Sequence, residues 1–218
     1  MLQGSIIPSV DDCVNNDTLW YPRKFLFHLG FNTIYAASFG DSISFDDKLY
    51  KKYQHYAELI TQNVFPIIVS SGLPKICRKI PFIKKYYDRH TMYTSNTYGT
   101  VGIWMKKAFN FDDEIWVKNG DKNKYYDIIQ QIPNKPNATF FEKMLYYYHQ
   151  SKDLTHQDLH ADFQTALIAG GDTTAATIEY GLYYLVKYPE LQNELYNELS
   201  KVFNDKNNIN LYANFGKL

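Results

Sequence analysis

Cysteine and arginine are scarce in this chain of 218 residues, and each shortage excludes a class of protein. Its two cysteines, Cys13 and Cys77, suggest no disulfide framework and fit a reducing compartment. Only three arginines occur, the formal net charge is zero, and no basic stripe is visible, so the sequence predicts no nucleic-acid partner. Cysteine and histidine form no cluster with metal-ligand spacing, so no metal site is predicted within the chain.

Long apolar runs are also absent. No stretch of about 18 apolar residues could span a membrane, and the N-terminus does not have the pattern of a signal peptide. No transmembrane segment is therefore expected in this chain; its location stays unknown, and would be cytoplasmic if the chain is expressed. Residues 64–69 (VFPIIV) form a short apolar run with two interpretations, either a buried loop or strand or a contact with a membrane surface.

Apolar residues recur at helical spacing over most of the chain, so the sequence predicts a mainly α fold. Gly40-Asp41 marks the end of one helix, and Gly99 and Gly102 interrupt the pattern of another. The residues before 19 are polar and carry little information, whereas residues 118–127 form a polar loop and 204–218 a low-complexity tail. Four shorter helices are expected, at 19–39, 46–62, 81–98 and 140–149. The last follows a linker at 131–138, and Thr139 and Glu142 have the spacing of a capping box at its start.

The longest predicted helix covers residues 155–187, about 48 Å at 1.5 Å per residue. Thr155 and Asp158 have the spacing of a capping box at its start. Its end is set by Pro189, which disfavours the helical conformation of the residue before it.

Residues 169–174 (AGGDTT) have low helix propensity although they lie inside the predicted helix, because glycine, aspartate and threonine are poor interior helix formers. One interpretation is a local bulge that lets a ligand approach the backbone, with Asp172 and Thr173 as a short proton relay. The alternative is a buried helix in an all-α bundle, where the glycines allow another helix to cross closely.

This run, together with Tyr188-Pro189-Glu190-Leu191-Gln192 after it, resembles the central-helix signature and the following helix of cytochrome P450 haem-thiolate monooxygenases. The resemblance covers about residues 19–203 and implies that residues 1–218 form a single partial P450 domain around the helix at 155–187. It also implies roles for particular residues. These are proton delivery by Asp172 and Thr173, haem contact by Ala169, Gly170 and Thr174, and substrate contact by Thr165 and Ala166.

For a complete parent protein the resemblance implies insertion of one oxygen atom from dioxygen into a small apolar organic substrate, with haem as cofactor and a reductase as partner. Two family motifs have no counterpart in this sequence, namely Phe-x-x-Gly-x-Arg-x-Cys-x-Gly, which supplies the axial cysteine, and Glu-x-x-Arg. We therefore expect an inactive internal fragment, from a truncated gene, a pseudogene or a mis-assembled gene, with doubtful haem binding. A non-catalytic helical interaction protein is the alternative.

Overall fold

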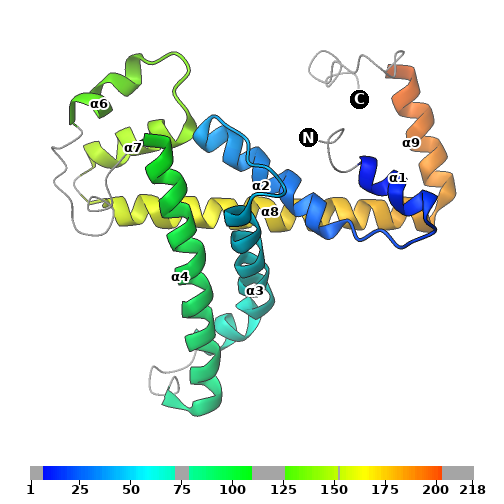
Figure 1. Cartoon of the computed structure of the whole chain (residues 1–218), viewed down its shortest axis with the longest axis horizontal. Coiled ribbons are helices and arrows are strands. Elements are labelled where there is room, and N and C mark those ends of the chain that lie inside the picture. The colour runs from blue at the N-terminus through cyan, green and yellow to red at the C-terminus, as the bar shows by residue number, and fades with distance from the viewer. Residues whose placement is uncertain (1–6, 72–78, 110–125, 152, 203–218) are drawn as a thin grey trace. The chain divides into compact units, whose positions relative to one another are not determined.

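The computed structural model describes residues 7–71, 79–109, 126–151 and 153–202, and every regular element within these ranges is a helix (Figure 1). The predicted mainly α fold is therefore confirmed. The elements are α1 (Ile7–Asn15), α2 (Arg23–Phe39), α3 (Lys48–Ser71), α4 (Pro81–Phe109), α6 (Tyr126–Gln131), the 3₁₀ helix η3 (Ile132–Asn134), α7 (Phe140–Gln150), α8 (His156–Lys187) and α9 (Pro189–Val202).

Residues 7–15, for which no element was predicted, form a helix, and Pro8 lies in its first turn, where proline is tolerated. The predicted end of α4 was wrong. Gly99 and Gly102 do not end α4, which continues to Phe109. Each glycine weakens a helix by only about 1 kcal/mol relative to alanine. The buried Val101, Trp104 and Met105 on the same stretch provide enough packing to offset that loss.

Helix α3 also extends further than predicted. It runs to Ser71, so the backbone of residues 64–69 is helical and forms neither a loop nor a strand. The predicted loop at 118–127 and the tail at 204–218 lie outside the described residues, apart from the first two residues of α6.

The chain divides into two units, residues 1–175 and 176–218, and the boundary falls inside α8. In the first unit α3 and α4 run side by side (Figure 1). Aromatic side chains fill the space between these helices and α2. Phe31 lies with its ring centroid 5.0 Å from that of Tyr50, 5.2 Å from Tyr53 and 5.5 Å from Trp104. All four side chains are buried, so this aromatic cluster fixes how α2, α3 and α4 pack.

A second aromatic cluster joins α2, α7 and α8. Phe141 lies with its ring centroid 5.5 Å from Phe39 and 5.0 Å from Phe163. The start of α7 is set by the predicted capping box, in which Thr139 Oγ1 accepts from the Glu142 backbone N–H and the Glu142 carboxylate accepts from the Thr139 N–H. The capping box thus fixes where α7 begins, and the Phe141 ring packs α7 against α2 and α8.

The turn after α2 is held by polar contacts. Gly40 has φ of 76°, a left-handed conformation that glycine adopts without strain. Asn32 bonds to both the N–H and the C=O of Ile43, and His28 Nε2 lies 3.0 Å from the same carbonyl oxygen. Burial lowers the pKa of His28 below its ordinary value, so this imidazole is neutral at pH 7.

The second unit contains the end of α8 and all of α9, and many of its large apolar side chains are exposed. Val186 is 81% exposed and Leu191 43%, and the ammonium of Lys187 lies over the rings of Tyr183 and Tyr188. Within the described ranges, none of the helices combines the length and apolar character needed to cross a membrane.

Candidate functional site on helix α8

Helix α8 begins as the sequence predicts. The Thr155 N–H donates to Asp158 Oδ2 at 2.7 Å, and the Asp158 N–H donates to Thr155 Oγ1 at 3.3 Å. These two bonds satisfy backbone donors that the first turn of a helix leaves open. From His156 the helix is α-helical at every residue to Lys187, so the expected bulge at 169–174 is absent.

The two glycines of this run instead permit a close crossing by α2. A Cβ atom added to Gly30 would lie 2.6 Å from the carbonyl oxygen of Gly170, a distance that real Cβ atoms do not reach. A Cβ atom on Gly171 would lie 2.9 Å from the Phe27 ring, and one on Gly170 would overlap Ile34. The helix-crossing interpretation therefore accounts for the glycines.

Another face of α8 is open and lined by small side chains. Thr165, Ala169 and Thr173 are exposed and four residues apart, which places them in one row along the helix, and Ala166 beside them is half-buried. We call these four residues the α8 stripe. The Thr165 hydroxyl donates to the Ala161 carbonyl at 2.9 Å, and the Thr173 hydroxyl donates to the Ala169 carbonyl at 2.8 Å. Both hydroxyl oxygens are thereby held at defined positions on the stripe.

Asp172 points to a different side of the helix from Thr173, because consecutive residues are about 100° apart. Arg23 Nη2, at the start of α2, donates to Asp172 Oδ1 at 2.5 Å, and the two side chains are 36% and 25% exposed. The pair lies in the wall of a cavity of about 770 Å³, which Lys24 and Glu58 also line. The two residues of the predicted relay thus have separate hydrogen-bond partners, Arg23 and the Ala169 carbonyl.

The other predicted site residues divide between two faces. Ala169 lies on the α8 stripe, with the predicted substrate-side residues Thr165 and Ala166. Gly170 and Thr174 contact α2, since Thr174 Cβ lies 3.0 Å from where a Cβ of Gly30 would be. Sequence reasoning gave Arg23 no role. Its partner is 149 residues away, and no local pattern connects the two.

A comparison with protein families identifies the family to which the chain belongs. The profile of the family described as "Cytochrome P450" matches residues 15–213, slightly more than the predicted range. The chain belongs to the cytochrome P450 family. The predicted resemblance is therefore confirmed, and α8 is the helix that carries the P450 signature.

Individual relatives agree with this assignment. Cytochrome P450 2H1 of Gallus gallus is 28% identical over 191 residues, which is 83% of this chain and 33% of the relative. Cytochrome P450 4Z1 of Homo sapiens is 39% identical over 59 residues, covering 27% of this chain and 12% of the relative. The chain thus spans about a third of the length of this Gallus gallus relative.

The P450 family implies a haem, and the α8 stripe fits one face of such a flat group. The stripe has no side chain larger than threonine, and its threonine oxygens are fixed by the bonds to Ala161 and Ala169. Cys13 is a free thiol on α1, and Cys77 lies outside the described residues. Among the described residues no three His, Cys, Asp or Glu side chains are grouped so that they could hold a metal ion.

Proposed function

We propose that this chain forms the oxygen-side wall of a P450 haem pocket, and that in a complete parent protein it serves a monooxygenase. The observation that carries the proposal is the open α8 stripe, which ends at Thr173, the residue that follows Asp172 in the sequence. Haem, when bound, supplies dioxygen activation. A reductase would supply the electrons, and one oxygen atom would enter a small apolar organic substrate.

The residues of this chain would then have the following tasks. Thr173 Oγ1 holds a proton at the stripe, and the Ala169 carbonyl keeps this hydroxyl oriented. Asp172 would take up a proton from water in the adjoining cavity, leave its ion pair with Arg23 and pass the proton to Thr173, after which Arg23 would bind the carboxylate again. The small side chains of Thr165 and Ala166 leave room for substrate. Gly170 and Thr174 stay predicted haem neighbours, although their side toward α2 is filled.

We further propose that residues 1–218 alone do not complete the reaction. Neither Cys13 nor Cys77 stands in the pattern that supplies the axial thiolate in the family. The alternative, a helical interaction protein, draws its support from the exposed apolar side chains of residues 176–202, including Tyr180 at 68% and Tyr196 at 56% exposure.

Ferric haem titrated into the purified, isotope-labelled chain would test the proposal. Because ferric iron is paramagnetic, the amide signals of Thr165, Ala169 and Thr173 should broaden first if haem lies on the stripe, while those of the buried Leu167 and Ala175 broaden less. Ala169→Trp should block this effect. Ile103→Trp, at a 52% exposed position of α4, is the matched control and should leave it unchanged.

Broadening elsewhere, or none, would contradict the oxygen-side assignment and favour the interaction protein. Reduction under carbon monoxide then tests the second part of the proposal. A strongly red-shifted Soret band, which thiolate ligation gives, would show that a cysteine of this chain binds the iron. The proposal that the chain lacks an axial thiolate would then be wrong.

A further inference from the structure

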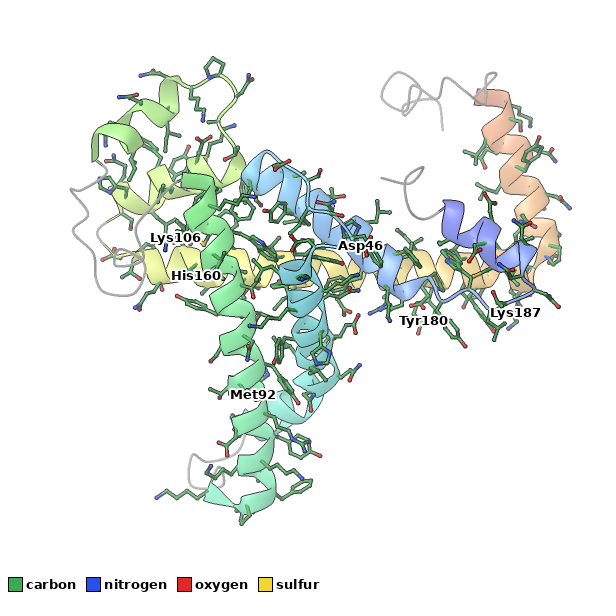
Figure 2. The ribbon with its side chains drawn as sticks, viewed as in Figure 1. Asp46, Met92, Lys106, His160, Tyr180 and Lys187 are labelled. Atoms are coloured by element: carbon green, nitrogen blue, oxygen red, sulfur yellow. The ribbon has the colours of Figure 1, made fainter. Side chains whose placement is uncertain are left out.

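His160 lies on α8 at the place where α4 crosses it (Figure 2). Its side chain is only 3% exposed, and its Nε2 lies 2.7 Å from the carbonyl oxygen of Tyr98 on α4. The imidazole stacks on the Tyr98 ring with the centroids 3.5 Å apart and the planes at 14°. On the next turn of α4, Gly102 leaves room for the imidazole, since a Cβ there would lie 3.0 Å from His160 Cε1.

These contacts define the protonation state of His160. A carbonyl oxygen can only accept, so Nε2 carries the hydrogen and donates it to Tyr98. Burial lowers the pKa of His160 to about 4, although the bond to the Tyr98 carbonyl acts in the opposite direction. The imidazole is therefore neutral at pH 7, and a second proton would place a charge in a region with little access to water.

The titratable and charged groups around His160 come from three helices. On α4 they are the Tyr98 phenol, whose pKa is raised by burial, and the cation Lys106, one turn beyond Gly102. On α8 the adjacent carboxylates are Asp158, which bonds to Thr155, and Asp162, which accepts from the Tyr148 hydroxyl of α7. Both carboxylates thus already have bonding partners of their own.

A second contact between the same helices does not titrate. Gln164, one turn after His160, donates from Nε2 to Thr97 Oγ1 at 2.6 Å and to the Thr94 carbonyl at 3.0 Å. This amide keeps its hydrogen bonds at any pH between 4 and 8. A charge on His160 would therefore weaken the contacts with Tyr98 and Gly102, while the hydrogen bonds of Gln164 to Thr94 and Thr97 would remain.

We propose that His160 is a proton-sensitive latch: its neutral imidazole holds α4 against α8, and protonation releases this crossing. His160 is thus a positioning residue, not a catalytic one. The proposal goes beyond the haem chemistry and does not depend on it, so a failure of haem binding would leave it intact.

Amide hydrogen exchange of the full chain at pH 7.5 and pH 5, corrected for intrinsic rates, tests the latch. When α4 separates from α8, His160 is exposed to water and has the ordinary histidine pKa of 6.5. When the two helices are packed together, its pKa is about 4. The protection of residues 98–106 should therefore fall about thirtyfold at pH 5. The protection of α2, which packs on another part of α8, should change much less. His160→Gln retains an N–H donor without titrating, and should remove most of the pH dependence at residues 98–106.

His28→Gln is the matched control, because His28 is also buried with a lowered pKa but contacts the turn after α2. It should leave the pH dependence of α4 unchanged. Equal loss of protection on α2 and α4, or the same pH dependence in His160→Gln, would overturn the latch. If His160→Gln does not fold, an imidazole titration of the unsubstituted chain by NMR decides, because titration of His160 near pH 6.5 in the closed state would also overturn it.

Discussion

Two helices cross α8 within the first unit, and they do so with opposite chemistry. At the α2 crossing, Gly30, Gly170 and Gly171 bring backbone against backbone, and neighbouring apolar side chains fill the remaining space. At the α4 crossing, His160 and Gln164 reach across to backbone and hydroxyl oxygens of α4. The first contact depends on close packing of backbone and apolar side chains, with the Arg23–Asp172 ion pair beside it, whereas the second depends on hydrogen bonds and on one protonation state.

The difference shows how one long helix can be rigid in one part and adjustable in another. The α2 crossing lies at the turn that carries Asp172 and Thr173, where the proposed chemistry requires fixed positions. The α4 crossing lies about ten residues earlier, or about 15 Å along the helix. A change there can move α4 without displacing the relay residues, because α2 holds their turn of α8 through separate contacts at Gly30, Gly170 and Gly171.

The largest expected effect comes from Gly30→Ala at the α2 crossing. The added methyl group would meet the Gly170 backbone oxygen at 2.6 Å, and a backbone atom cannot rotate away as a flexible side chain can. We expect a loss of about 3 kcal/mol in the free energy of unfolding, measured by urea denaturation. Gly181→Ala, on α8 where a Cβ would meet nothing within 4 Å, is the control and should raise stability by up to about 1 kcal/mol. If the two variants were equally stable, the crossing would be looser than described.

The next effect is the pH dependence contributed by the α4 crossing. The folded-state pKa of His160 is about 4, below its ordinary value of 6.5, so its contribution is complete above pH 6.5 and is lost as the pH falls toward 4. Between pH 7.5 and pH 5 this amounts to about 2 kcal/mol of unfolding free energy. Urea denaturation at both pH values should show a smaller difference for His160→Gln than for the unsubstituted chain. A difference of the same size would assign the acid sensitivity to other groups, His28 first among them.

The sequence predicted those features that depend on neighbouring residues. Both capping boxes, at Thr139 and Thr155, formed as expected, and the helix predicted at 155–187 is His156–Lys187. Capping needs only residues three positions apart, so the information is local. The family assignment was equally accessible, because residues 169–174 carry its signature in one continuous run.

Features that depend on distant contacts could not be predicted. The continuation of α4 past Gly99 depends on burial of Trp104 among aromatic side chains of α2 and α3. A bulge in α8 was expected from the same two glycines that the structure uses for the α2 crossing, since the sequence shows glycine but not what approaches it. His160 likewise drew no interpretation, because a single histidine has no pattern and its partner is a backbone carbonyl 62 positions earlier.

The smallest expected change in stability concerns Gly99 and Gly102, two glycines in the interior of α4. A Cβ at Gly99 would meet nothing within 4 Å, whereas one at Gly102 would lie 3.0 Å from His160 Cε1. Gly99→Ala should therefore gain about 1 kcal/mol of stability from helix propensity. Gly102→Ala has the same gain, but it displaces the His160 ring from the Tyr98 carbonyl, so we expect its net effect to be close to zero or destabilising.

A double-mutant cycle distinguishes ring displacement from a general intolerance at this position. In a His160→Ala background the obstructing ring is absent, so Gly102→Ala should regain the stabilisation of Gly99→Ala, and the coupling energy should be about 1 kcal/mol. Additive effects would mean that Gly102 does not make room for the imidazole. The α4 crossing would then depend on Gln164 and the Tyr98 contact alone, and its contrast with the glycine-packed α2 crossing would become sharper.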